Sequence, residues 1–226
     1  MEAKPMQTRK LYLLGGNTSQ EEANVHFAQA AGGPKAYIAL LIVYREGWEA
    51  FLPRYTIHWT AQGVREDNIA VIVPDETGYL DTEKAANIIK NATGVFIGGG
   101  HSETYYSRYT KQPFKQLLTE KYHAGIPLAG NSAGALIMPE TVLLSPHDTD
   151  HQQAWSGPGL GLLQNQLISV HFSQWQDEPN LLAGLNQHNI PLGYGIDEDA
   201  CLYLENELPA AVFGNEQVKC IEKGTL

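Results

Sequence analysis

Pro-Leu-Ala-Gly-Asn-Ser-Ala-Gly, residues 127–134, leads from a short apolar segment through a glycine-flanked serine into the helix-prone residues 135–138. Its centre, Gly130-Asn131-Ser132-Ala133-Gly134, has the G-x-S-x-G pattern of a nucleophile elbow, a sharp turn between a strand and a helix. Glycine has no Cβ, so the chain can turn tightly there and expose the Ser132 hydroxyl above a sheet edge. The motif is short, and small residues at this spacing also suit close packing of a strand on a helix.

Continuous apolar runs recur along the chain before the elbow. They span residues 10–14, 37–44, 69–73 and 95–97. Such runs are typical of strands that are buried on both faces of a parallel sheet. Helix-prone segments lie between them, at residues 46–62, 81–91 and 103–122, and Pro53 and Pro113 mark a kink or a first turn. The alternation predicts a single doubly wound α/β domain over residues 1–226, which binds ligands beyond the carboxyl ends of its strands.

The pattern becomes looser after the elbow. A further strand is predicted at residues 167–172 and a helix at residues 178–187. Short strands joined by polar turns are then predicted at residues 195–197, 200–204, 210–213 and 218–221. No helix-length gap separates these strands, so we expect the chain to end in an antiparallel extension.

Composition limits the classes of partner. The chain has 226 residues, 43% of them hydrophobic, and a formal net charge of −10, which argues against nucleic acid and anionic membrane surfaces as partners. The chain has no apolar run near the roughly 20 residues of a membrane span, and residues 1–10 are too polar for a signal peptide. We therefore expect a cytoplasmic protein with a small substrate, and leave homo-oligomerisation open. Cys201 and Cys220 are expected to be buried thiols, with a cross-strand pair as the alternative.

A serine nucleophile needs a base to accept its proton, and the base needs an acceptor that fixes its tautomer. Of the eight histidines, His171 is the best placed, because it ends a predicted strand at the sheet edge where Ser132 is expected. A strand-end histidine that is bonded only to the backbone is the alternative. Asp148 and Asp150, in the loop-like residues 145–151, could each orient His171, and the residues alone do not choose between them.

A triple glycine, residues 98–100, follows the strand at 95–97 and precedes a predicted helix. It therefore lies at the same sheet edge, and the amides of Gly100 and Ala133 are the expected oxyanion hole. A phosphate cradle is the competing interpretation. However, the triple glycine lacks the Lys-Ser/Thr of a Walker loop and the spacing of G-x-G-x-x-G.

Two histidines and two aspartates lie within residues 147–151 and could together bind a divalent metal ion. The neighbouring Pro146 and the polar composition favour a solvated loop over a rigid metal site. We therefore expect neither a metal nor a cofactor.

Three blocks together resemble the serine peptidase family that contains dipeptidase E and cyanophycinase. They are residues 95–101 (VFIGGGH), 130–135 (GNSAGA) and 157–172, which end in His171-Phe172. The block at residues 193–200 is closer to the cyanophycinase branch. The resemblance implies a flavodoxin-like fold related to class I glutamine amidotransferases. It further implies that Ser132 is the nucleophile, His171 the base, and Gly100 and Ala133 the oxyanion donors, with the acid near Asp148 and Asp150 still open.

The chain departs from the family where substrate is bound. Cyanophycinases have a glutamine shortly after the glycine run and arginines just past the histidine. Here, Ser102 follows His101, and residues 175–180 (WQDEPN) contain no arginine. A substrate carboxylate would lose its bidentate partner. We therefore expect Trp175 and Asp177 to favour a neutral or amine-bearing side chain, with His101 and Ser102 as further candidate contacts.

The sequence predicts an intracellular serine peptidase that hydrolyses small peptides through an acyl-enzyme. A serine esterase of the α/β-hydrolase type shares the elbow, but its histidine lies much farther from the serine than the 39 positions found here. A relative without catalysis that binds a small ligand in the same cleft is the third interpretation, favoured by the missing arginines.

Overall fold

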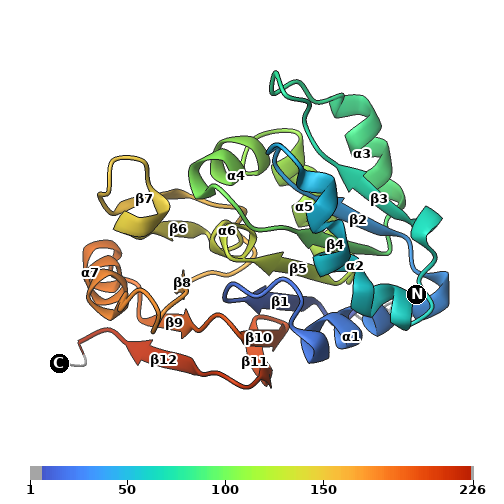
Figure 1. Cartoon of the computed structure of the whole chain (residues 1–226). Helices are drawn as coiled ribbons and strands as arrows, with labels where there is room; N and C mark the ends of the chain where they lie inside the picture. The colour runs from blue at the N-terminus through green and yellow to red at the C-terminus, as the bar shows by residue number, and fades with distance from the viewer. Residues whose placement is uncertain (1–6, 225–226) are drawn as a thin grey trace, which may run out of the picture.

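The computed structural model describes residues 7–224 and has a seven-stranded sheet at its centre (Figure 1). The strand order is β11-β10-β1-β5-β4-β2-β3, in which β1, β5, β4, β2 and β3 are parallel and β10 and β11 are antiparallel additions. The strands are β1 (Lys10–Leu14), β2 (Ile38–Leu41), β3 (Ile69–Ile72), β4 (Gly94–Ile97), β5 (Leu128–Asn131), β10 (Ala200–Glu205) and β11 (Leu208–Gly214).

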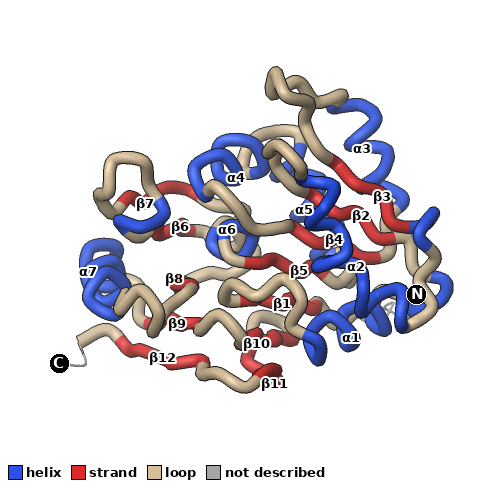
Figure 2. Tube along the Cα trace, viewed as in Figure 1, coloured by secondary structure: helices blue, strands red, loops and turns tan. Residues whose placement is uncertain are grey.

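Both faces of this sheet are buried, as the continuous apolar runs predict. Along β1, Tyr12 and Leu14 belong to one hydrophobic cluster, and Leu11 and Leu13 belong to another. The first cluster is completed by α1 (Glu21–Ala30) and α2 (Leu52–Ala61). The second is completed by α3 (Thr82–Asn91), α4 (Ser102–Tyr109), α5 (Phe114–His123) and α6 (Ala133–Leu136). Helices thus cover both faces of a mainly parallel sheet, which confirms the predicted flavodoxin-like α/β class (Figure 2).

Two smaller sheets adjoin the central one. β8 (Gln166–Val170), β9 (Leu192–Ile196) and β12 (Val218–Glu222) form a sheet in the order β12-β9-β8, against which α7 (Glu178–His188) packs. β6 (Thr141–Leu144) and β7 (Trp155–Pro158) form a two-stranded sheet. The expected antiparallel extension is therefore only partly right. The C-terminal strands are divided between two sheets, and β8 and β9 are parallel because α7 connects them.

Two predicted helices are interrupted. The helix expected at residues 103–122 is divided into α4 and α5, because Pro113, which has no backbone N–H, occupies the N-cap of α5. The helix expected at residues 46–62 begins as a 3₁₀ turn, Trp48–Phe51, and Pro53 then lies in the first turn of α2. Further 3₁₀ turns span Gly33–Lys35, Glu66–Asn68 and Pro146–Asp148.

Both cysteines are free thiols, so the alternative of a cross-strand pair is wrong. Cys201 is buried as expected, whereas Cys220 is exposed on the outer strand β12. Within residues 7–224, none of the helices is both long enough and apolar enough to span a membrane.

Candidate active site

Ser132 lies at the carboxyl end of β5, immediately before α6, in a strained backbone conformation. Its φ of 49° and ψ of −114° lie in a region that residues with a Cβ rarely adopt. The turn is fixed by hydrogen bonds, because Ser132 N donates to Leu14 O at 2.9 Å and Ser132 O accepts from Ala135 N at 2.8 Å. The sequence motif therefore forms the elbow that it predicts, with Ser132 at its apex.

The glycines on either side of Ser132 are required by close packing. A Cβ on Gly130 would lie 2.5 Å from the backbone of Gly134, across the elbow. A Cβ on Gly134 would lie 2.3 Å from Ile97 O on the neighbouring strand β4. Real Cβ atoms do not approach other atoms so closely, so the elbow admits only glycine at these two positions.

His171 directly follows β8 and faces Ser132. The Ser132 hydroxyl donates to His171 Nε2 at 3.0 Å, and His171 N donates to Gly15 O at 2.9 Å. A Cβ on Gly16 would lie 2.4 Å from His171 Cε1, so the glycine after β1 makes room for the ring. The two residues paired by sequence reasoning are therefore within hydrogen-bond distance.

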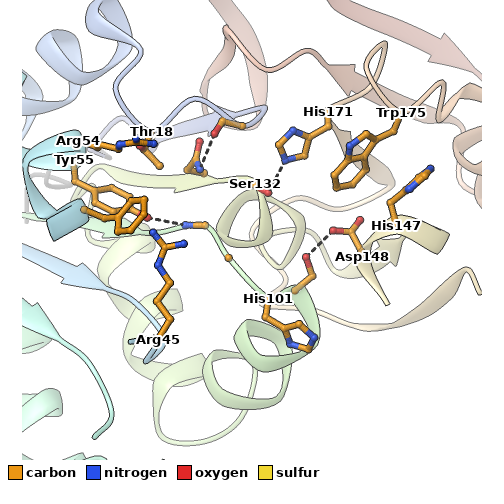
Figure 3. A pocket seen from close by; sticks show the side chains of 16 residues that line it. Thr18, Arg45, Arg54, Tyr55, His101, Ser132, His147, Asp148, His171 and Trp175 are labelled. Carbon is orange, nitrogen blue, oxygen red and sulfur yellow. Dashed lines mark hydrogen bonds between the residues drawn. The ribbon is translucent and has the colours of Figure 1, made fainter. Parts of the chain in front are cut away.

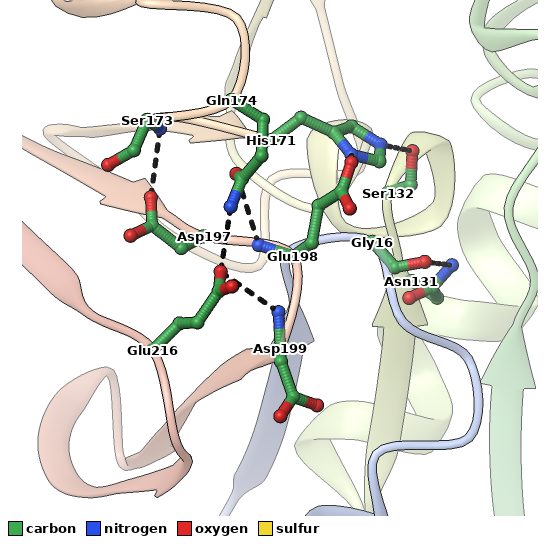
Figure 4. A network of polar contacts seen from close by, with 10 residues as sticks. All are labelled: Gly16, Asn131, Ser132, His171, Ser173, Gln174, Asp197, Glu198, Asp199 and Glu216. Atoms are coloured by element: carbon green, nitrogen blue, oxygen red, sulfur yellow. Dashed lines mark hydrogen bonds and ion pairs between the residues drawn. The ribbon is translucent and has the colours of Figure 1, made fainter.

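The carboxylate bonded to His171 is Glu198, not Asp148 or Asp150. His171 Nδ1 donates to Glu198 Oε1 at 2.8 Å (Figure 4). Glu198 lies in the turn between β9 and β10, where the chain crosses from the small sheet to the central sheet. The expectation that the acid comes from residues 145–151 is therefore wrong in geometry, because this later turn brings its carboxylate to the far side of the imidazole.

Asp148 and Asp150 have other partners. Asp148, 9% exposed, accepts from Ser102 Oγ at 2.6 Å and from Ser145 N at 3.2 Å. Burial raises the pKa of Asp148 above its ordinary value, although these hydrogen bonds oppose the shift. Asp150 is exposed and accepts from His101 Nε2 at 3.0 Å, and this hydrogen bond lowers the pKa of Asp150. Asp148 thus holds Ser102 in place at the edge of the cleft, and Asp150 connects His101 to the loop at residues 145–151.

The glycine run after β4 lies beside the serine. Gly99 N donates to Tyr55 Oη at 3.3 Å, and Tyr105 Oη donates to Gly99 O at 3.1 Å, so two tyrosines fix this segment. Gly100 has a φ of 152°, which favours glycine. Gly100 borders the cleft, and Ala133 is the first residue of α6, one position after Ser132. These are the two amides expected to form the oxyanion hole.

A cleft of about 430 Å³ opens over Ser132 (Figure 3). Of the residues singled out in the sequence, Gly100, His101, Ser102, Ser132, Asp148, His171 and Trp175 line it. Asp150 and Asp177 are not among its lining residues. Asp177 is only 6% exposed and accepts from Ser169 Oγ at 2.6 Å. It is therefore poorly placed to contact a substrate, contrary to expectation.

Two arginines line the cleft: Arg45 lies before α2, and Arg54 lies in the first turn of α2. The guanidinium of Arg45 lies 3.4 Å from the centroid of the Phe51 ring, and that of Arg54 lies 5.0 Å from it. Among residues 7–224, neither guanidinium forms an ion pair with a carboxylate. Figure 3 shows both on the side of Ser132 away from His171 and Trp175. Arginine is absent after His171, as the sequence shows, but it reaches the site from another element.

The loop at residues 147–151 does not bring its own histidines and aspartates together as a metal site. Asp150 instead lies with His101 and Glu103, with their potential ligand atoms within 4.8 Å of one another. All three are at least partly exposed, and the imidazole of His101 already donates to Asp150.

Sequence reasoning missed Glu198, Gly16 and the two arginines. Residues 193–200 form a block that resembles the cyanophycinase branch, and the signal for Glu198 is a carboxylate in a predicted turn at a strand end within this block. The glycine pair at 15 and 16 gave a signal too, since a glycine after the first parallel strand lies at the same sheet edge as Ser132. Arg45 and Arg54 gave none, because exposed arginines near a helix start are common.

Comparisons with known proteins identify the family of the chain and its fold. The sequence profile of peptidase family S51 matches residues 66–210. Cyanophycinase from Synechococcus elongatus is 28% identical over 200 residues, which cover 87% of this chain and 62% of that protein. Cyanophycinase from Nostoc sp. is 26% identical over 229 residues, which cover 96% of this chain and 75% of that protein. The chain thus spans less than two thirds of the Synechococcus relative. The crystal structure of a peptidase from an acI-B1 actinobacterium shares the fold, with a TM-score of 0.72, 18% identity and coverage of 98% and 97%.

Proposed function

The chain belongs to peptidase family S51, and from this premise we propose that it is a serine peptidase whose triad is Ser132, His171 and Glu198. The family predicted from the elbow, the glycine run and the His171 block is thereby confirmed. The observation that carries the proposed activity is one continuous chain of hydrogen bonds. It runs from the strained Ser132 hydroxyl to His171 Nε2 at 3.0 Å and from Nδ1 to Glu198 at 2.8 Å.

Each group has a role in acyl transfer. His171 Nε2 takes the proton from Ser132 Oγ as that oxygen bonds to the substrate carbonyl carbon, and the Gly100 and Ala133 amides stabilise the oxyanion that forms. The resulting imidazolium is stabilised by the Glu198 carboxylate. The imidazolium of His171 then returns the proton to the leaving amine as the C–N bond breaks. Water, deprotonated by the same imidazole, releases the acyl group and restores Ser132.

The charges of the cleft support a narrower proposal for the substrate class. Because His171 protonates the leaving amine, the leaving group lies toward His171 and the acyl group lies on the opposite side of Ser132. That side carries Arg45 and Arg54, whose guanidinium groups have no carboxylate partner among the described residues. Guanidinium groups are well suited to bind carboxylates, often in bidentate geometry. We therefore propose small peptides with a carboxylate on the acyl residue, in place of the neutral or amine-bearing side chain expected from Trp175 and Asp177.

A fluorophosphonate probe tests the proposed activity directly. We expect the intact protein to be labelled, with labelling absent in Ser132→Ala and strongly reduced in His171→Ala. Ser107→Ala, an exposed serine on α4, is the matched control and should be labelled like the unchanged protein. No labelling of the folded protein would favour a silent ligand-binding relative, and hydrolysis of esters far above peptides would favour an esterase.

A pair of dipeptides tests the substrate class. Asp-X and Asn-X differ only by one charge, and we expect the unchanged protein to prefer Asp-X in kcat/KM. Arg45→Gln and Arg54→Gln should each reduce this preference by about 5- to 10-fold, since a hydrogen bond to a charged group contributes about 1.5–3 kcal/mol and exposure weakens it. Arg65→Gln, an exposed arginine outside the cleft, is the control. Equal turnover of Asp-X and Lys-X would contradict the assignment.

A further inference from the structure

Trp175 is stacked on the histidine of the proposed triad. The indole and the His171 imidazole have centroids 4.3 Å apart and ring planes 24° apart. The His147 ring lies 5.2 Å from Trp175, on the side away from His171 (Figure 3). The indole therefore covers one face of the imidazole, at a distance within which a cation interacts with an aromatic ring.

The stack is held by a rigid turn. Trp175 N donates to His171 O at 2.8 Å, and Asp177 N donates to Phe172 O at 3.0 Å. The buried Asp177 carboxylate accepts from Ser169 Oγ at 2.6 Å, which anchors the end of the turn to β8. Ser173 N donates to Asp197 Oδ1 at 2.9 Å, which anchors its start beside the Glu198 turn. The two rings are thus held together before any substrate arrives.

We propose that Trp175 is a positioning residue that stabilises the protonated form of His171 during catalysis, a role that rests on the proposed function. When His171 Nε2 takes the proton of Ser132 Oγ, the ring becomes a cation that faces the electron-rich indole. The other groups that act on this cation are the carboxylates of Glu198 and Asp148 and, beyond the indole, the ring of His147. The indole adds to the two carboxylates by covering one face of the ring, whereas Glu198 bonds at the ring edge, at Nδ1.

Substitutions of Trp175 separate this role from packing. Trp175→Leu keeps an apolar side chain but removes the aromatic face, and should lower kcat about 5- to 30-fold, which is about 1–2 kcal/mol at 1.36 kcal/mol per tenfold. KM should change less than about threefold, because the indole stabilises the transition state rather than the bound substrate. Trp175→Phe should recover most of the loss. Trp155→Leu is the matched control, because Trp155 is exposed, contacts the Tyr106 ring edge-to-face and lies outside the cleft.

The pH dependence gives a signature that packing alone would not produce. Losing a group that stabilises the cation should move the acid limb of kcat/KM to lower pH in Trp175→Leu. Losing a group that only shields the ring from water should move it to higher pH. A shift to higher pH, no shift, or equal effects of leucine and phenylalanine would overturn the proposal, as would a loss confined to KM.

A measurement without turnover separates this proposal from the proposed function. In the Ser132→Ala background, the titration of the His171 ring followed by nuclear magnetic resonance should shift to lower pH when Trp175 becomes Leu. Replacing Trp175 alone by its tetrafluoroindole analogue keeps the shape and weakens the ring face, so the same shift is expected even if the leucine variant does not fold. Absence of this shift would refute the role of Trp175, whereas absence of fluorophosphonate labelling would refute the peptidase itself.

Discussion

Replacing Glu198 by glutamine tests the proposed triad most directly. The carboxylate accepts from His171 Nδ1 at 2.8 Å, and its side chain is 49% exposed, whereas that of His171 is 16% exposed. Two unit charges about 4 Å apart interact by about 4 kcal/mol near a protein surface and about 1 kcal/mol in water. The exposure of Glu198 places it between these limits, at about 2–3 kcal/mol, or a loss of about 30- to 150-fold in kcat.

This loss is smaller than the roughly 10⁴-fold loss seen when a buried triad acid becomes an amide, because water at Glu198 already screens its charge. The assay is steady-state hydrolysis of one dipeptide by Glu198→Gln, Asp148→Asn and Asp150→Asn side by side. We expect only the first to lose more than about tenfold, since the other two carboxylates bond Ser102 and His101 rather than His171. A Glu198→Gln enzyme within threefold of the unchanged protein, with Asp148→Asn severely impaired, would refute the reasoning.

Three further outcomes are expected. Arg9 lowers the pKa of Glu207, so this ion pair stabilises the fold above about pH 4.5. Glu207→Gln should lower the free energy of unfolding in urea by about 1–2 kcal/mol at pH 7. This deficit should shrink as the pH falls below about 4.5. Ser132→Gly should unfold at higher temperature than Ser132→Ala, because glycine relieves about 1 kcal/mol or more of backbone strain at φ 49°; equal melting temperatures would show that the elbow stores none. Gly16→Ala should lower kcat at least about tenfold, because the added Cβ would lie 2.4 Å from His171 Cε1. An unchanged kcat would show that the His171 ring can move aside without loss of activity.

The elbow and its surroundings could be predicted because the signals are local. The spacing of glycines around Ser132 is a property of five consecutive residues, and the buried runs at β1 to β4 reflect burial on both faces of one sheet. The carboxyl ends of parallel strands lie at one edge, so Ser132 and the glycine run were correctly expected to be neighbours. His171 followed from the same rule applied to β8, although β8 belongs to another sheet.

Glu198 could not be assigned because its position depends on a crossing between sheets. Short runs joined by polar turns predict strands at residues 195–197 and 200–204, but they do not show that β9 and β10 lie in different sheets. The positions of Arg45 and Arg54 depend on how the segment from residue 45 to the first turn of α2 packs beside the glycine run, which hydrophobic periodicity does not predict. The single helix expected at residues 103–122 is divided in the structure, and its sequence does not decide this, because Pro113 is compatible with either a kink or a new helix start.

The three proposed triad residues come from separate parts of the fold. Ser132 ends β5 of the seven-stranded sheet, His171 follows β8 of the three-stranded sheet, and Glu198 lies in the turn that joins the two. The hydrolysis rate should therefore fall when one sheet shifts relative to the other, before either sheet unfolds. A variant that weakens the contact between the two sheets would keep its circular dichroism spectrum while its hydrolysis rate falls sharply. The hydrolysis rate is therefore the more sensitive measure of how the two sheets are packed together.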